Sequence, residues 1–223
     1  MLGTLIVRRN RFAAEVAVDG REALAHVPNS GRMLELMVPG TGVVLRPAIG
    51  AGRKTAYDLL AVRYAGRWVG VDARIPPSVV VQAWRDGLLP GLAAYDNVKR
   101  EVVFGGSRLD LRFDGPGGVA YVEAKSVNLV EDGVALFPDA PTLRGARHLL
   151  ELRDAVRQGH RGAVCFVVQR DDVRVLRPFR EADPAFADAL AAVVRDGVEA
   201  YAIACVTDID GTRPVGLVPV EAA

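Results

Sequence analysis

The sequence has few cysteines and no long apolar run. Its 223 residues include two cysteines, Cys165 and Cys205, and each lies in an apolar segment, which predicts packed thiols rather than a disulfide or a metal-ligand pair. No apolar run approaches the roughly 18 residues that span a bilayer. The N-terminal residues MLGTLIVRRNRF place their basic cluster after the apolar stretch, which is not the order of a signal peptide. We therefore expect a cytoplasmic protein without a membrane segment.

Motifs for nucleotide cofactors and for nucleophilic catalysis are also missing. No G-x-G-x-x-G follows a strand-like segment and no Walker loop occurs, which disfavours dinucleotide and NTP binding. No serine stands in a recognisable set with His and Asp partners. His26 and His160 lack ligand spacing, so we assign them no role.

Charge is balanced over the whole chain but not along it. Residues 1–77 hold 11 Lys and Arg against 6 Asp and Glu, whereas residues 78–223 hold 17 against 21. These differences of +5 and −4 sum to the net charge of +1. A basic module of this kind is compatible with a nucleic-acid partner.

The first third of the chain has the pattern of a small β-barrel. Residues 3–74 form short alternating segments, with turn signals such as Asp19-Gly20 every 8 to 12 residues. This predicts a five-stranded barrel of the oligonucleotide-binding (OB) type in residues 1–77. Ile75–Ser78 contains two prolines, which cannot continue a strand ladder, and we place the domain boundary there.

Residues 78–223 alternate between helical and strand patterns. Helical spacing covers 79–89, 141–159 and 184–197, and strand patterns cover 98–104, 107–125, 162–170 and a last strand at 198–206. This order predicts a mixed sheet flanked by helices. The fold class of the whole chain is therefore α+β, a barrel followed by an α/β domain.

A hairpin at SRLDLRFDGPGGVAYVEAK, Ser107–Lys125, carries charged residues inside its strands. A four-residue loop, Gly115–Gly118, pairs Asp114 with Val119 and places Asp110 opposite Glu123. The other face is then wholly apolar, and a one-residue slip would mix the two faces. The pattern therefore predicts that Asp110 and Glu123 are neighbours.

Two neighbouring carboxylates in a sheet require a cation or a proton. Opposed strand residues lie about 5 Å apart at Cβ, where like charges destabilise the fold. Carboxylate oxygens favour a hard ion such as Mg²⁺ or Mn²⁺. Lys125 projects to the same face as Glu123, where it can orient water or stabilise charge on a phosphate. Only three of the 28 basic residues are Lys, which makes a lysine at this position informative.

The alternative is a solvated polar face. Arg108 and Arg112 could neutralise the two acids as cross-strand ion pairs. Glu101, on the preceding strand, is either a further metal-binding carboxylate or a surface partner of Lys99 or Arg100.

Basic residues in several places are candidates for binding nucleic acid, and each is equally compatible with ordinary surface. Barrels of this type bind single strands through basic loops and aromatic platforms. The turn Asn29–Arg32 could hold a phosphate through its backbone amides. Arg144 and His148 share a helix face; Arg144 could touch a phosphate, and His148 suits a structural hydrogen bond. The candidates are Arg8, Arg9 and Arg11 beside Phe12, then Arg32, Arg53, Lys54 and Arg144.

Two levels of resemblance add to these predictions. Asp110, a hairpin turn and Glu123-x-Lys125 resemble the PD-(D/E)xK nuclease superfamily. The wider sequence resembles the sugar fermentation stimulation protein family nearly end to end. The similar segments are PNSGRMLELMVPG (28–40), RKTAYDLLAV (53–62), SRLDLRF (107–113), YVEAKSVNLV (121–130) and FPDAPTLRGARHLLEL (137–152).

The resemblance implies a DNA-binding protein with an N-terminal barrel and a nuclease-like C-terminal domain. It implies that Asp110, Glu123 and the carbonyl of Ala124 bind the metal and that Lys125 is the catalytic lysine. Ala124 stands where the family pattern more usually has Val, at a position that the register directs into the core.

Two functions follow. The first is a Mg²⁺- or Mn²⁺-dependent nuclease, and the second is a non-catalytic DNA-binding regulator of sugar metabolism that reuses a nuclease fold. An intact set of Asp110, Glu123 and Lys125 favours the first, and we expect Glu123→Gln to stabilise the metal-free protein by removing a repulsion.

Overall fold

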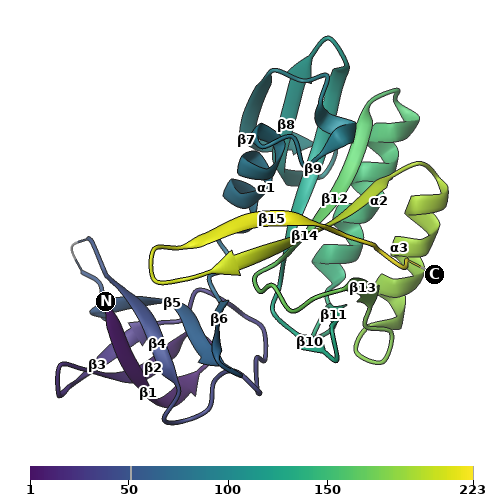
Figure 1. Ribbon diagram of the computed structural model, residues 1–223. Coiled ribbons are helices and arrows are strands. Elements are labelled where there is room, and N and C mark those ends of the chain that lie inside the picture. The colour runs from purple at the N-terminus through teal and green to yellow at the C-terminus, as the bar shows by residue number, and fades with distance from the viewer. Residues whose placement is uncertain (51, 223) are drawn as a thin grey trace.

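The computed structural model describes residues 1–50 and 52–222, which form a barrel followed by a larger α/β part (Figure 1). Five strands build the barrel in the order β3-β2-β1-β4-β5, and a parallel pairing of β3 with β5 closes it. Leu5, Val16, Val43 and Leu59 are buried inside it. The prediction of a five-stranded OB-like barrel is confirmed. The strands are β1 (Leu2–Asn10), β2 (Ala13–Val18), β3 (Arg21–His26), β4 (Gly42–Pro47) and β5 (Tyr57–Tyr64).

The turn between β2 and β3 illustrates how the sequence forms this barrel. Asp19 and Gly20 both have positive φ, 49° and 75°, as a two-residue primed hairpin turn requires. Val18 pairs with Arg21 across the turn, so the alternating apolar residues of β2 all point to the barrel core.

A short strand and a helix connect the barrel to the rest of the chain. Strand β6 (Arg67–Gly70) pairs with β5 and, through Trp68 opposite Thr207, with the α/β sheet. Helix α1 (Pro76–Arg85) follows. Its two prolines occupy the first helical positions, where a missing N–H costs nothing. The boundary predicted after residue 77 falls in the first turn of this helix.

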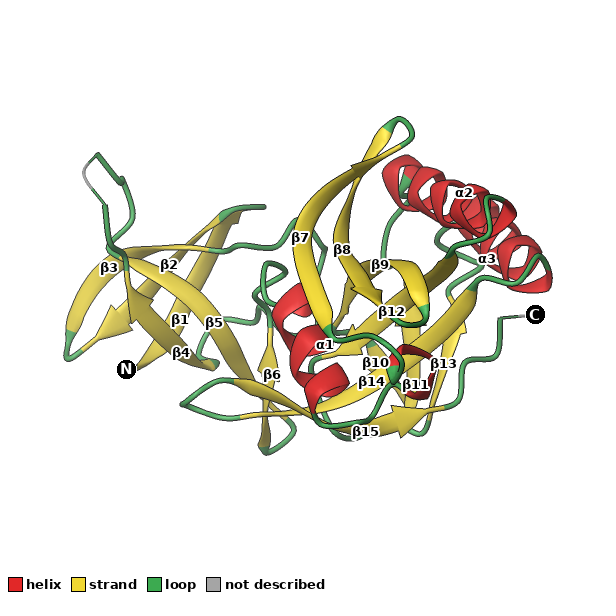
Figure 2. Ribbon diagram, turned by 90° about the horizontal axis from the view of Figure 1, so that it is seen from above, coloured by secondary structure: helices red, strands yellow, loops and turns green. Residues whose placement is uncertain are grey.

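The α/β part is a mixed sheet with helices on both faces. Its order is β14-β12-β9-β8-β7; β12 runs parallel to both β9 and β14, and the other neighbours are antiparallel. Helix α1 packs on one face, and α2 and α3 pack on the other (Figure 2). The predicted sheet flanked by helices is therefore confirmed. Its elements are β7 (Asn97–Phe104), β8 (Ser107–Gly115), β9 (Gly118–Val127), α2 (Leu143–Arg157), β12 (Arg161–Val168), α3 (Pro184–Arg195) and β14 (Glu199–Thr207).

Several short elements differ from the sequence-based expectation. Strand β14 is not the last one, because β15 (Thr212–Val218) pairs antiparallel with it. Pro214 and Gly216 within β15 obscure its strand pattern. A second small sheet and a short 3-10 helix were also not predicted, since strands of two to four residues carry too little pattern. These are β10 (Val130–Glu131), β11 (Val134–Phe137), β13 (Val175–Pro178) and the 3-10 helix η1 (Pro90–Leu92).

Both cysteines are buried free thiols, as predicted. They lie in β12 and β14, and burial raises the pKa of Cys205 to about 12, so this thiol carries no charge at neutral pH. Within residues 1–50 and 52–222, no helix is both long enough and apolar enough to cross a membrane.

Candidate metal and nucleic-acid site

The β8–β9 hairpin has the predicted register with a tighter turn. Asp114 pairs with Val119, as expected, but Gly115 also pairs with Gly118, so the loop is two residues rather than four. The pairing runs back to Leu111 opposite Val122 and ends there, one step before Asp110 and Glu123. The two acids therefore sit where the two strands separate.

The separation of the strands gives Asp110 a specific role. Beyond Val122, β9 continues its parallel pairing with β12, with Glu123 opposite Val164, while β8 stays paired with β7. At this point Ala124 N donates a hydrogen bond of 2.8 Å to Oδ2 of Asp110. A carboxylate oxygen thus accepts a backbone hydrogen bond where the ladder has opened.

Glu123 is buried, and among the described residues its carboxylate accepts hydrogen bonds on Oε1 alone. Its Oε1 accepts a hydrogen bond of 2.7 Å from Lys125 Nζ and another from His148 Nδ1. Its Oε2 is buried and has no hydrogen-bond partner in the described part of the chain. Only 5% of the Glu123 side chain and 12% of the Lys125 side chain are exposed. Buried polar atoms without a partner are rare and call for an explanation.

The surroundings drive the pKa values of the two acids in opposite directions. Burial, and then the negative charge of Glu123, raise the pKa of Asp110. Burial also acts to raise the pKa of Glu123, but the His148 hydrogen bond and the Lys125 ammonium outweigh it and lower that pKa. Glu123 therefore holds its charge while Asp110 takes up a proton more readily, a divergence that is common in paired functional carboxylates.

The solvated-face alternative does not describe this hairpin. Arg112 binds Asp114 at 2.6 Å and Arg108 binds Glu101 at 3.2 Å, so neither arginine neutralises the acid pair. The carboxylate of Glu101 is 73% exposed and occupied by this surface ion pair. The structure therefore does not bring Glu101 to the other acids, and its surface partner is Arg108 rather than Lys99 or Arg100.

Helix α2 supplies the remaining side chains of the site. Thr142 begins the helix by accepting a hydrogen bond of 3.0 Å from Gly145 N. Six residues after Thr142, His148 is buried and hydrogen-bonded to Glu123, so this residue makes a hydrogen bond, as predicted, and its partner is now identified. Nε of the exposed Arg144 lies 3.4 Å from His148 Nε2.

A cleft of about 950 Å³ lies between the barrel and the α/β part, beside this cluster. Lys125 and Ala124 line one wall, and residues 136–142 border it. On the barrel side, the cleft is lined by Arg8, Arg11 and Arg32. Three of the predicted nucleic-acid-binding residues therefore meet Lys125 in one cavity.

The turn at Asn29–Arg32 is not an open phosphate site. Arg32 N donates a hydrogen bond of 2.8 Å to Oδ2 of Asp139, and Gly31 N donates to Asn29 Oδ1, also at 2.8 Å. Two of the amides expected to hold a phosphate, those of Gly31 and Arg32, are thus occupied. Arg8 also donates to the carbonyls of Gly31 and Arg32, which fixes the turn against the barrel.

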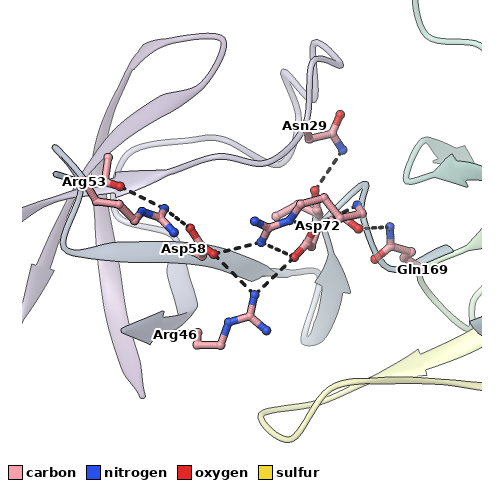
Figure 3. A network of polar contacts seen from close by, with 9 residues as sticks. Asn29, Arg46, Arg53, Asp58, Asp72 and Gln169 are labelled. Atoms are coloured by element: carbon pink, nitrogen blue, oxygen red, sulfur yellow. Dashed lines mark hydrogen bonds and ion pairs between the residues drawn. The ribbon is translucent and has the colours of Figure 1, made fainter. Parts of the chain in front are cut away.

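The other predicted basic residues lie outside the cleft lining. Arg9 pairs with Glu15 at 2.6 Å, and Lys54 is exposed. Arg53 binds the buried Asp58 within a network, shown in Figure 3, that includes Arg46 and the buried Asp72. Burial acts to raise the pKa of Asp58, but its ion pairs with Arg53 and Arg74 outweigh this and lower the pKa to about 2. Arg53 therefore neutralises a buried acid rather than forming a free basic loop.

The sequence did not predict that Asn128 and Asp139 would meet the barrel in this cleft. Asp139 and Asn128 lie about 100 residues beyond the turn that they meet, and Asn128 Oδ1 accepts a hydrogen bond of 3.3 Å from Asn29 Nδ2. The segment FPDAP stood out in the sequence, but nothing in the sequence indicated that it contacts the barrel.

No three His, Cys, Asp or Glu side chains form a metal-type cluster in residues 1–50 and 52–222. A cation here would therefore rest on two side-chain carboxylates and on other oxygen ligands.

Comparison with family models covers most of the chain. Residues 6–71 match the model described as SfsA N-terminal OB domain. Residues 74–211 match the model described as sugar fermentation stimulation protein RE domain.

Individual relatives agree with this assignment. The chain is 42% identical to a sugar fermentation stimulation protein homolog of Desulforamulus reducens, over 97% of this chain and 90% of that protein. It is 44% identical to the homolog of Alkaliphilus metalliredigens, over 93% of this chain and 90% of that one. A solved structure described as Pyrococcus furiosus SfsA in complex with Ca²⁺ superposes with a TM-score of 0.90 and 32% identity, covering 99% of this chain and 95% of that one.

Proposed function

The chain belongs to the sugar fermentation stimulation protein family, and from that premise we propose that it is a nucleic-acid-binding protein that hydrolyses phosphodiester bonds with a divalent cation. Asp110 and Glu123 are the metal-binding carboxylates, and Lys125 is the catalytic residue. Nucleic acid, most simply DNA, lies in the cleft between the barrel and the α/β part.

The unpartnered oxygen of Glu123 carries this proposal. Oε1 has two donors, whereas Oε2 is buried with none among the described residues. The carboxylate of Asp110 is close enough for the charge of Glu123 to raise its pKa. A buried carboxylate oxygen without a donor, beside a second carboxylate, fits a hard cation such as Mg²⁺ or Mn²⁺. The relative from Pyrococcus furiosus is described in complex with Ca²⁺, another cation that takes oxygen ligands.

The residues of this chain divide the work. Asp110 and Glu123, with the Ala124 carbonyl as a further ligand implied by the family, would hold the cation. When bound, the cation would polarise the phosphoryl group and neutralise its charge. Lys125 lines the cleft with its ammonium 2.7 Å from Glu123. From there it would orient an attacking water and stabilise negative charge that develops on the phosphate.

Arg8, Arg11 and Arg32 would hold the polyanion. They line the barrel side of the cleft opposite Lys125, so a strand that contacts them would also pass Lys125, which adjoins the acid pair through Glu123. Binding of this kind weakens steeply with salt, because each phosphate that the protein neutralises releases counterions.

One observation favours the regulator as a second candidate. The ammonium of Lys125 neutralises Glu123 without a cation, so the ion pair can persist in a protein that binds DNA and never cleaves it. Both candidates predict DNA binding, and they differ only in metal binding and cleavage.

Labelled single- and double-stranded DNA, incubated with the purified protein and Mg²⁺, Mn²⁺ or EDTA, tests the proposal. We expect cleavage only with a divalent cation. Lys125→Ala should lose most cleavage and keep metal binding, whereas Lys99→Ala, at the 62%-exposed lysine of β7, should behave like the wild type. If neither cation binds in calorimetry and no substrate, RNA included, is cleaved, the regulator is the correct function.

A further inference from the structure

The carboxylate of Glu123 is held asymmetrically by donors from two elements. Lys125 comes from the same strand and His148 from helix α2, and both donate to Oε1. His148 is 2% exposed and Glu123 is 4% exposed. With both donors on one oxygen, the carboxylate cannot rotate freely, and its second oxygen stays available for a cation.

The hydrogen-bond network orients the ring of His148. Nδ1 faces a carboxylate oxygen, which can only accept a hydrogen bond. Nε2 faces Nε of Arg144 at 3.4 Å, and an arginine nitrogen can only donate. This arrangement therefore places a hydrogen on Nδ1, from which the ring donates to Glu123, and turns Nε2 toward Arg144.

We infer that His148 is a positioning residue for the metal ligand Glu123, an inference that rests on the proposed metal site. The imidazole N–H occupies Oε1 together with Lys125 and thereby keeps Oε2 free. Without that N–H, the carboxylate can turn so that Lys125 bridges both oxygens and competes with the cation. Partners that orient a ligand in this way typically contribute about 10- to 100-fold to metal affinity.

A purely structural role makes a different prediction. If His148 only fills a buried polar position between α2 and β9, its replacements should reduce stability and leave metal affinity unchanged. Two amide variants separate these roles. His148→Asn places an amide N–H near the position of Nδ1, and His148→Gln places it near the position of Nε2, whereas both introduce the same polar group into the same buried place.

Calorimetric titration of the full-length wild type and both variants with Mn²⁺ and with Ca²⁺ is the decisive experiment. We expect His148→Gln to bind about 10- to 100-fold more weakly than the wild type and His148→Asn to stay within about threefold of it. Unfolding temperatures in EDTA should fall further in His148→Gln, because only that variant loses the hydrogen bond to the charged Glu123. If the wild type binds metal and the two variants bind it equally well, the positioning role is refuted. If the wild type binds neither cation, the proposed metal site itself is refuted.

A spectroscopic measurement on the wild type covers the case in which the Gln variant does not fold. The chain has three histidines, so nitrogen-15 spectra of the imidazole rings are simple, and the loss of one signal in His148→Asn assigns it. We expect Nδ1 of His148 to carry a hydrogen, both without metal and with Ca²⁺. An Nε2–H tautomer, or loss of the Nδ1–H signal when Ca²⁺ binds, would overturn the inference.

Discussion

The two acids of the hairpin should respond to neutralisation with opposite signs. In the metal-free protein, Asp110→Asn removes a charge that burial and Glu123 both disfavour, and the Asn side-chain oxygen still accepts from Ala124 N. Relief of a like-charge cross-strand pair is worth about 0.2–1 kcal/mol. We therefore expect Asp110→Asn to stabilise the metal-free protein by that amount.

Glu123→Gln should destabilise it, which corrects the expectation from sequence alone. Gln keeps an acceptor for Lys125 and His148 but makes both hydrogen bonds neutral at the acceptor. Hydrogen bonds to charged groups contribute about 1.5–3 kcal/mol, against about 0.5–1.5 kcal/mol for neutral ones. The two weakened hydrogen bonds and the poorly solvated ammonium of Lys125 outweigh the relief of the repulsion between the acids. The free energy of unfolding should therefore fall by about 1–2 kcal/mol.

Urea unfolding in EDTA at neutral pH measures both changes. The pH dependence has a defined sign. The pKa of Asp110 is raised in the folded protein, so the destabilisation by its charge disappears as pH falls and the acid takes up a proton. The pKa of Glu123 is lowered in the folded protein, so the stability that its charge contributes is also lost as pH falls. Both variants should therefore approach the wild type in acid. Stabilisation by both variants would show that the acids form an isolated repulsive pair, and destabilisation by both would show that Asp110 carries no net penalty.

Further substitutions test the cleft residues and the ion pair of Arg53. Asp139→Asn removes a carboxylate from the cleft wall and should raise affinity for single-stranded DNA several-fold in a polarisation assay, with no change meaning that the cleft is not the binding surface. Arg11→Ala should weaken binding and flatten its salt dependence by about one phosphate contact, whereas Arg9→Ala should do neither. Arg53→Ala should cost about 1–3 kcal/mol in urea unfolding; because the pKa of Asp58 is about 2, that cost should be full above the unfolded pKa and fade as pH falls toward 2.

The barrel and the hairpin register could be predicted because their information is local. The Asp19-Gly20 turn and the alternation in β2 specify a hairpin within a dozen residues, and the apolar set around Leu111 and Val122 permits one register only. Each of these patterns depends on neighbours along the chain or across a single turn.

Contacts between distant segments could not be predicted in the same way. His148 reaches Glu123 across 25 residues, and Arg32 reaches Asp139 across 107. Their chemical types were visible in the sequence, but which donor meets which acceptor depends on how helix α2 and the barrel pack against the sheet. The same limit explains Arg53, whose partner Asp58 is near in sequence but buried by the fold.

The position of the acids in the sheet explains why charged residues are tolerated inside these strands. Asp110 lies where β8 and β9 separate, so its carboxylate can satisfy the Ala124 amide that the ladder no longer serves. Glu123 lies in a strand that remains paired with β12, so its backbone stays within the sheet. Its side chain has two hydrogen-bond donors, and both bind Oε1. A site made for stability alone would satisfy both oxygens. Under the proposed function, Oε2, which has no partner among the described residues, is the oxygen that would bind the cation where the strands separate.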